Sequence, residues 1–383
     1  MRPSGPEVRA WPYTGALIVV LLIGIHLQLM DFPNPLVQNC EFGAPAEHDQ
    51  AVIEDDVRAS RKAAEVGSLP VQRLLPLSNE HSWRFGFGMP RQAHPGQWAE
   101  AIGAGWYLDW GAVPQQSHLD PEYWLTVRVA PSCARPTPLS AARLARLSTG
   151  RTWVIGNEPD VIWQDNRTPE AYATAYWELY KAIKKADPTA QVAVGAVSQS
   201  TPLRLTYLDR VLEAYAARYG RQMPVDIWTV HGFVLREQRG SWGVGIPPGF
   251  SNAQGRSYEL SDHGRLDLFE AQLRDFRRWM ATRGYRDRPL TLTEFGILMP
   301  PQYGFPEDKV VDYLLGAFEL LHTMSDPEFG FSEDGYRLVQ RWAWYSLEDN
   351  FYPTGNLAQL SNGTLTPLGQ AYRSYVSGLQ NTP

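Results

Sequence analysis

The sequence predicts an α/β fold, a (β/α)8 TIM barrel preceded by a hydrophobic N-terminal anchor and a short stalk. From Trp83 onward, short β-branched and aromatic runs alternate with helical segments, as expected of parallel strands joined by crossover helices. Eight such units can be identified, and no glycine-rich nucleotide loop follows the first strand, which favours a closed barrel over an open sheet. The 383 residues accommodate a barrel of about 250 residues plus extensions.

Residues 1–30 are predicted to be a signal-anchor or transmembrane segment. The run from 15 to 30 is apolar apart from His26 and Gln28, and it follows a short positively charged segment. No small-residue cleavage site follows it, so an uncleaved single-pass anchor in the cell membrane is favoured, with the rest of the chain outside. Because the run is slightly short of the roughly 20 residues that a spanning helix prefers, a secreted protein and a buried soluble helix are the alternatives.

Residues 31–80 are predicted to be a linker or stalk. Proline-rich pieces flank a polar helical stretch, Glu47 to Val66, whose many charges leave little continuous apolar face. The remaining residues, 81–383, form the predicted barrel domain.

Within the barrel, strands are expected near Trp83–Phe87, Gly105–Trp110, Tyr123–Val129, Thr152–Gly156, Gln191–Val197, Asp226–Phe233, Pro289–Glu294 and Arg341–Ser346. The clearest helices are expected at Thr168–Ala186, Thr201–Arg218, Leu266–Arg283 and Glu307–Thr323, and a last one at Pro367–Val376 closes the ring. Several of these helices open with Thr or Ser followed by Pro, a common helix start.

The longest connection, Val234 to Gly264, follows the sixth strand and is rich in Gly and Pro with interspersed aromatic residues. Loops that follow strands form the reactive face of such a barrel, so we expect this loop to be a substrate wall. A disordered insert is the alternative, because Gly and Pro also mark floppy segments.

Composition excludes several classes of function. The net charge is −6 and no basic run is present, so a nucleic-acid partner is not expected. Cys40 and Cys133 are the two cysteines, and no Cys or His cluster has metal-ligand spacing, so neither a metal nor a cofactor is predicted. The 14 Trp residues suit stacking on the apolar faces of sugars, although most are expected to fill the core.

Two glutamates carry the main functional prediction. Glu158 and Glu294 fall at the ends of predicted strands four and seven, where side chains project onto the reactive face, so we expect them to converge. Cleavage of a glycosidic bond requires such a pair, because one carboxyl must hold a proton while the other stays ionised. Either glutamate alone would more often be a solvated surface charge.

The segments around these glutamates resemble a known family. Gly156-Asn157-Glu158-Pro159 and Thr293-Glu294-Phe295-Gly296 are similar to the acid/base and nucleophile motifs of the retaining (β/α)8 glycoside hydrolase clan, clan A. The resemblance extends in outline from about Trp83 to Val376, and the nearest members are families five, thirty-nine and one hundred twenty-eight.

The resemblance implies roles for individual residues. Glu158 is implied to be the general acid/base, Glu294 the nucleophile, and Asn157 the amide that bonds the sugar 2-hydroxyl. Trp344 is similar to the strand-eight tryptophan beneath the cleaved sugar, and His231 to the clan's frequent histidine at the end of strand six. An unpaired histidine at a strand end is otherwise commonly structural.

The sequence departs from the clan at one position. Phe233 stands where the clan usually has Tyr, so the hydroxyl expected near the nucleophile must come from Tyr303 or Tyr345, or be absent. Asp109 and Trp110 occupy the end of strand two, where they either bind sugar hydroxyls or turn the chain.

The predicted function is a retaining glycosidase that cleaves β-linked glycosides or oligo- and polysaccharides by a two-glutamate double displacement. Retention implies carboxyl groups about 5 to 5.5 Å apart and a raised pKa for Glu158. A membrane-tethered carbohydrate-binding protein without turnover is the alternative. A metal-dependent barrel hydrolase or a phosphate-handling isomerase fits poorly, because neither His-x-His on strand one nor a late glycine-rich anion site is present. The sugar, its linkage and endo or exo action are left open.

Overall fold

The computed structural model describes residues 82–91, 93, 95–113 and 121–379. The predicted anchor and the stalk, including its polar helix, lie outside the described residues, so those predictions stay untested. Across the described residues, no helix has both the length and the apolar character that crossing a membrane requires.

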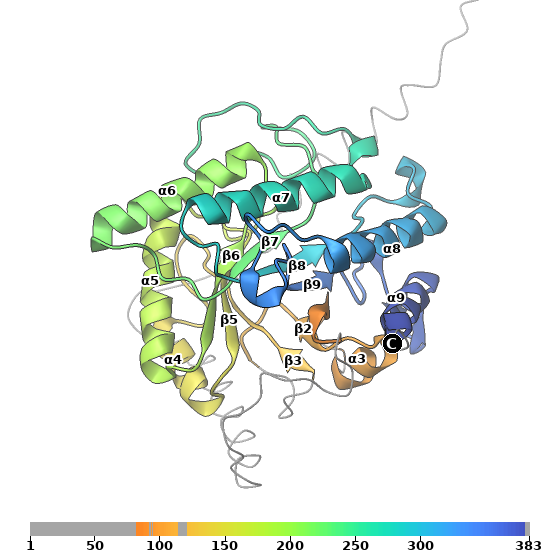
Figure 1. Cartoon of the computed structure of the whole chain (residues 1–383), viewed down its shortest axis with the longest axis horizontal. Helices are drawn as coiled ribbons and strands as arrows, with labels where there is room; N and C mark the ends of the chain where they lie inside the picture. Colours follow the sequence, from red (N-terminus) through yellow and green to blue (C-terminus); the bar gives the residue numbers. More distant parts are fainter. Residues whose placement is uncertain (1–81, 92, 94, 114–120, 380–383) are drawn as a thin grey trace, which may run out of the picture.

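Strands and helices alternate along the described chain, as predicted (Figure 1). The strands of the main sheet are β1 (Phe85–Gly88), β2 (Trp106–Leu108), β3 (Glu122–Tyr123), β4 (Leu125–Val127), β5 (Thr152–Asn157), β6 (Gln191–Ala196), β7 (Trp228–His231), β8 (Leu290–Phe295) and β9 (Arg341–Trp344). The helices are α3 (Pro95–Ile102), α4 (Pro138–Leu147), α5 (Pro169–Ala186), α6 (Pro202–Tyr219), α7 (Leu266–Thr282), α8 (Glu307–Thr323) and α9 (Pro367–Leu379). A short antiparallel pair, β10 (Ala358–Gln359) and β11 (Thr364–Leu365), precedes the last helix.

Parallel pairing carries the sheet around a closed ring. β1 pairs with β2 on one side and with the last barrel strand, β9, on the other, and the order continues through β8 to β7. On the other side β2 pairs with β3, which a single residue separates from β4, and β4 pairs with β5 and β5 with β6. Two parallel bridges, Ala193 to Ile227 and Val197 to Val230, connect β6 to β7. The predicted closed barrel is therefore observed.

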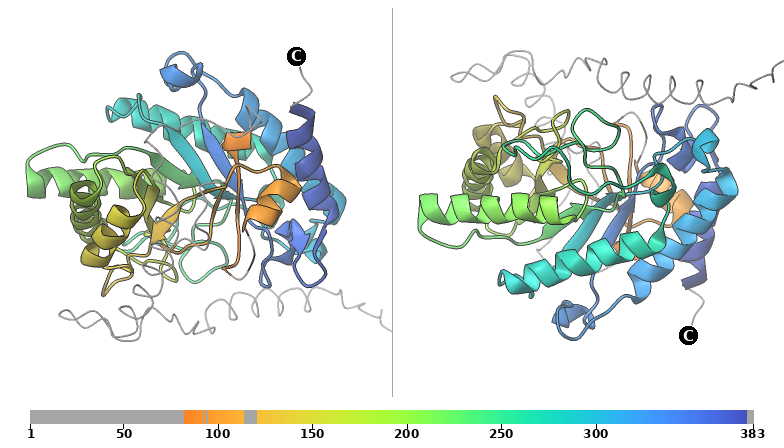
Figure 2. Two further views of the ribbon diagram at one scale, coloured as in Figure 1. Left: turned by 90° about the horizontal axis from the view of Figure 1, so that it is seen from below. Right: turned by 90° about the horizontal axis from the view of Figure 1, so that it is seen from above.

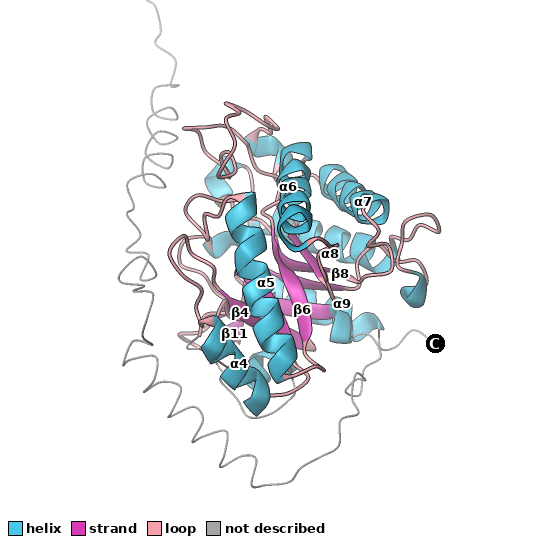
Figure 3. Cartoon of the chain, turned by 90° about the vertical axis from the view of Figure 1, so that its left-hand side faces the viewer, coloured by secondary structure: helices cyan, strands magenta, loops and turns pink. Residues whose placement is uncertain are grey.

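The helices lie outside this ring of strands (Figure 2; Figure 3). Several begin at a threonine whose hydroxyl accepts a bond from a backbone N–H in the first turn, with Pro directly after it, as at Thr168 of α5 and Thr201 of α6. The hydroxyl satisfies a backbone donor that has no partner within the helix, and Pro provides the φ that the first turn needs. These local signals explain why the helix starts could be predicted.

The core has two layers because successive residues of a strand point to opposite faces. One face of the strands packs against the helices, and the other fills the barrel interior with a small set of side chains: Trp106, Leu108, Trp124, Val154, Ala193, Ile227 and Ala343. β1 contributes glycines to the interior. A Cβ at Gly86 would lie 2.3 Å from the ring of Trp106, and one at Gly88 would lie 2.9 Å from the ring of Trp110. Glycine on β1 therefore makes room for two tryptophan rings.

Candidate active site

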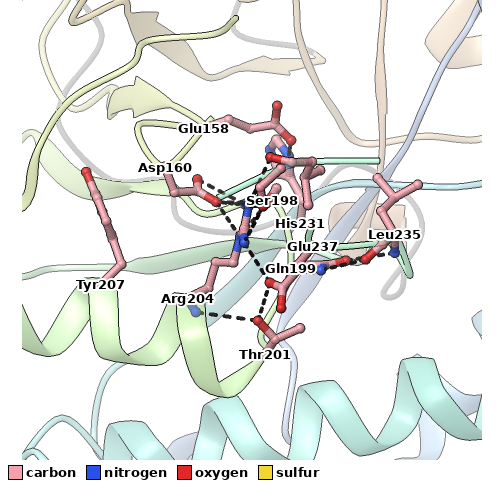
Figure 4. Close-up of polar contacts among 12 residues, drawn as sticks. Glu158, Asp160, Ser198, Gln199, Thr201, Arg204, Tyr207, His231, Leu235 and Glu237 are labelled. Carbon is pink, nitrogen blue, oxygen red and sulfur yellow. Dashed lines mark hydrogen bonds and ion pairs between the residues drawn. The ribbon is translucent and has the colours of Figure 1, made fainter. Parts of the chain in front are cut away.

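The two predicted glutamates lie close together at the carboxyl end of the barrel strands. Glu158 follows β5 directly and Glu294 lies near the end of β8, and both are buried, at 8% and 6% exposure. His231, the last residue of β7, places Nδ1 3.0 Å from Oε1 of Glu158 and Nε2 3.4 Å from Oε1 of Glu294. One imidazole thus contacts both carboxylates, so the expected convergence is observed. Figure 4 shows His231 beside Glu158.

Glu158 is held in an unusual backbone conformation. Its φ is +46°, in the left-handed region that L-residues rarely adopt, and Gly156 before it has a φ of +96°. The Glu158 N–H donates to the carbonyl of Ala196, so the turn is tied to β6. This turn directs the Glu158 side chain into the cavity instead of continuing the strand.

Two buried aspartates fix the segments around Glu158. Asp165 accepts bonds from the backbone N–H groups of Asn157 and Val129 and from the guanidinium of Arg128, and it thereby joins the ends of β4 and β5. Asp160 accepts from the backbone N–H and the hydroxyl of Ser198. Sequence reasoning missed both aspartates, although Asp160 directly follows the Gly156-Asn157-Glu158-Pro159 motif.

A buried arginine connects Asp160 to the long loop (Figure 4). Arg204, on the first turn of α6, is fully buried and bonds Asp160 at 3.1 Å and Glu237 at 2.7 Å. Its remaining N–H groups donate to the carbonyls of Val244 and Gly245. Every charge in this network has a partner, as buried charges require. The loop 234–264 is thus pinned to the barrel and is not a disordered insert.

Hydrogen bonding and charge set the state of Glu294. The indole N–H of Trp110 donates to Oε1 of Glu294 at 2.6 Å. Burial raises the pKa of Glu294 to about 7, and the negative charge of Glu158 raises it as well, whereas His231 and the Trp110 bond lower it.

His231 responds to the same carboxylates. Burial by itself lowers the pKa of this imidazole, but the charges of Glu294 and Glu158 and the bond to Glu158 outweigh it, so the net shift is upward from 6.5. A protonated imidazole between two carboxylates reduces their mutual repulsion. His231 therefore allows two acidic groups to occupy one buried cavity.

Asn157 and Asp109 are located near the pair in different ways. Asn157 is the last residue of β5, next to Glu158. Asp109 is buried and accepts hydrogen bonds from the Tyr123 hydroxyl and from the Gly111 N–H. Asp109 and Gly111 are the two residues that flank Trp110 in the sequence. Of the two roles considered for Asp109, these contacts favour turning the chain over binding sugar hydroxyls.

The structure corrects the expectation for Trp344. Its side chain is fully buried, its indole N–H donates to the Gly355 carbonyl, and its ring packs against Phe295 and Tyr313 in the layer beneath the helices. The reason is strand alternation, since Ala343 points into the barrel and Trp344 therefore points out. Tyr345, the next residue, is the one whose ring faces Trp110, at 5.5 Å between centroids.

Neither tyrosine considered as a donor bonds Glu294 among the described residues. The Tyr345 hydroxyl donates to Asp349 at 2.8 Å, and burial, followed by the charges of Glu294 and Asp349, raises its pKa. Tyr303 lies on a short 3-10 helix, Pro301–Tyr303, and its buried hydroxyl has no hydrogen-bond partner within the described part. Phe233 packs edge-on against His231 at 5.9 Å. Trp110 thus supplies the donor that the sequence left unassigned.

Apolar side chains from several loops form a wall near the pair. Val161, Phe233, Leu235 and Val244 pack together, and the partly buried Trp242, Leu298, Met299 and Tyr345 pack on them. Trp163, five residues after Glu158, is 38% exposed. An exposed indole of this kind can stack on the apolar face of a sugar. In the described part of the chain, no group of three or more His, Cys, Asp or Glu side chains could hold a metal ion.

Comparisons with known proteins support the fold. No protein-family model matches the chain, and no curated protein sequence matches it. A GH128 (subgroup II) endo-β-1,3-glucanase from Pseudomonas viridiflava has a similar structure, with 20% identity, a TM-score of 0.52, and coverage of 76% of this chain and 97% of that chain. A GH128 (subgroup II) endo-β-1,3-glucanase from Sorangium cellulosum is also similar, with 18% identity, a TM-score of 0.51, and coverage of 76% of this chain and 98% of that chain.

A third similar structure is a GH128 (subgroup III) curdlan-specific exo-β-1,3-glucanase from Blastomyces gilchristii in complex with glucose. It has 19% identity and a TM-score of 0.51, over 76% of this chain and 97% of that chain. At these identities the likeness establishes a shared fold. It agrees with the resemblance to clan A, in which family one hundred twenty-eight was among the nearest members expected.

Proposed function

We propose that this protein is a retaining glycoside hydrolase that cleaves β-1,3-linked glucans. The observation that carries the proposal is the single imidazole of His231 in contact with two buried carboxylates from β5 and β8. Glycosidic-bond cleavage needs two carboxyl groups in one cavity with one proton between them. The choice of β-1,3-glucan is supported by the substrates that name the similar structures.

In the proposed reaction Glu294 attacks the anomeric carbon while Glu158 donates its proton to the departing glycosidic oxygen. The C–O bond to the leaving sugar breaks and a covalent ester to Glu294 forms. Glu158, now ionised, takes a proton from water, and the hydroxide attacks the same carbon and releases Glu294. Two inversions at this carbon give net retention. Asn157, next to Glu158 on β5, is proposed to bond the sugar 2-hydroxyl.

The productive form of the pair holds one proton, on Glu158, with Glu294 ionised. Because burial raises the pKa of Glu294 to about 7, ionisation of Glu294 is the step that pH controls near neutrality. When Glu294 becomes esterified its charge is lost, and Glu158 releases its proton more readily. The same step that consumes the nucleophile therefore prepares Glu158 to act as a base.

The apolar wall is proposed to hold the glucan chain. Trp163 follows Glu158 by five residues and is exposed, and Trp242 is partly buried on the opposite loop. Sugar rings stack well on such side chains.

We also propose that residues 1–30 anchor the protein in the cell membrane, or direct its secretion, with 31–80 as a stalk. A barrel outside the cell could act on polymers too large to import.

Assays on polymeric and aryl substrates test the function. Purified protein should release reducing ends from a soluble β-1,3-glucan, and the initial product should be the β-anomer by NMR. Glu294→Ala should abolish turnover, and azide should restore it with an inverted product. A fluorinated β-glucoside should label Glu294. Binding of the glucan without any release of reducing ends would instead support the carbohydrate-binding alternative.

A further inference from the structure

We propose that the indole N–H of Trp110 is the positioning donor for Glu294, in a role that needs no tyrosine hydroxyl. The proposal rests on the function proposed above, since it concerns the residue that attacks the sugar. Trp110 Nε1 lies 2.6 Å from Glu294 Oε1, a short hydrogen bond from a neutral N–H to a carboxylate. Among the described residues, Trp110 is the one side chain hydrogen-bonded to Glu294.

The fold holds Trp110 in place from several sides. Trp110 follows β2 with a φ of +56°, and its ring lies beside Gly88, where a Cβ would be 2.9 Å away. Asp109, bonded to the Tyr123 hydroxyl and the Gly111 N–H, fixes the backbone on both sides of it. Tyr345 packs against its ring at 60°. The indole is therefore preorganised to direct its N–H at the carboxylate.

Other groups facing Glu294 do not take this role. His231, on β7, approaches Glu294 at 3.4 Å but its Nε2 has no hydrogen-bond partner in the described part of the chain. Arg128, after β4, is committed to Asp165, and Glu158 contributes a like charge. Tyr345, after β9, directs its hydroxyl to Asp349.

The bond has two consequences for the proposed chemistry. Because Oε1 of Glu294 is held by Trp110, Oε2 is the oxygen left to attack the anomeric carbon. An indole N–H can donate but cannot accept, so it stabilises an ionised carboxylate more than a protonated one. Trp110 therefore favours the ionised form of Glu294, which the reaction needs.

The first test is Trp110→Phe, which keeps an aromatic ring and removes the N–H. Two changes are expected in the pH profile of kcat/KM on a soluble β-1,3-glucan. The maximum should fall about tenfold because the attacking carboxylate loses its positioning donor. The acid limb, which reports the ionisation of Glu294, should move up by about one pH unit because the bond that lowers the pKa of Glu294 is lost. Trp279→Phe is the matched control, since the Trp279 indole N–H also donates to a carboxylate, Asp209, but in the helix layer. It should leave the limb in place. A lower maximum with an unmoved limb in Trp110→Phe would overturn the proposal.

The second test does not depend on catalysis. In protein labelled with 15N-tryptophan, the Trp110 indole resonance is identified by its loss in Trp110→Phe. Its shift should follow a titration near pH 7 in the wild type and should lose that titration in Glu294→Gln. An indole resonance that is insensitive to Glu294→Gln would overturn the proposal even if Trp110→Phe proves unstable. Protein that cleaves no β-glycoside overturns the proposed function, whereas the titration still decides whether Trp110 governs Glu294.

Discussion

Replacing Glu294 by glutamine should inactivate the protein and stabilise it above neutral pH. In the folded chain burial raises the pKa of Glu294 from 4.5 to about 7. The unfolded chain therefore holds fewer protons than the folded one between these values, and folding stability falls as pH rises through this window. Glutamine does not ionise, so Glu294→Gln escapes that loss.

The magnitude follows from the shift. One pKa unit corresponds to about 1.4 kcal/mol, so the shift of 4.5 to about 7 costs the wild type about 3 kcal/mol at pH 8. Glu294→Gln removes this cost. Part of the stability gained is offset, because the substitution also removes the Glu294 charge, which raises the pKa of His231. We expect Glu294→Gln to be more stable than the wild type by roughly 1–3 kcal/mol at pH 8 and by much less at pH 5.

Urea unfolding at pH 5 and pH 8, followed by circular dichroism, measures this difference directly. Glu213→Gln, at an exposed position of α6, is the matched control because it makes the same substitution away from the buried pair. Turnover of β-1,3-glucan by Glu294→Gln is measured on the same samples. The assignment of a raised pKa to the buried Glu294 carboxyl would be refuted if Glu294→Gln were less stable than the wild type at pH 8. It would also be refuted if the stability difference between the two did not grow with pH.

Three further predictions concern the surroundings of the pair. In carboxyl-labelled NMR of the wild type, Glu294 should titrate near pH 7, and Glu158→Gln should lower that pKa because a negative neighbour is removed. Arg204→Met should destabilise the fold by about 3–5 kcal/mol in urea unfolding, because two buried carboxylates lose their cation; an unchanged midpoint would contradict this. Trp344→Phe should lower the free energy of unfolding by about 1 kcal/mol, because the hydrogen bond to Gly355 is lost, and should leave kcat/KM nearly unchanged. A large loss of kcat/KM would instead show that Trp344 belongs to the substrate site.

Much of the site's location could be predicted from the chain. Glu158 and Glu294 were placed at the ends of strands four and seven because apolar runs define strands, and parallel strands of a barrel direct their ends to one face. His231 was added by the resemblance to the clan, and it is the last residue of β7. The helix starts at Thr168 and Thr201 were predicted from capping residues that act within one turn.

Side-chain direction could not be predicted in the same way. Trp344 and Tyr345 are neighbours, and a shift of one residue decides which of them faces the cavity. The register of β8 shifts between Leu292 and Phe295. Such irregularities leave no clear mark in a hydrophobic pattern. The pattern therefore predicts that a segment is a strand more reliably than it predicts which of its residues face the barrel interior.

The sequence by itself determined the alternating strands and helices, the barrel and the meeting of two glutamates, because these depend on hydrophobic period and on chain ends that parallel strands bring together. Tertiary structure alone decided what surrounds them: the Trp110 bond to Glu294, the Arg204 network and the outward direction of Trp344. These contacts join residues that are distant in the chain, and their geometry depends on how whole elements pack, which no local pattern of residues records.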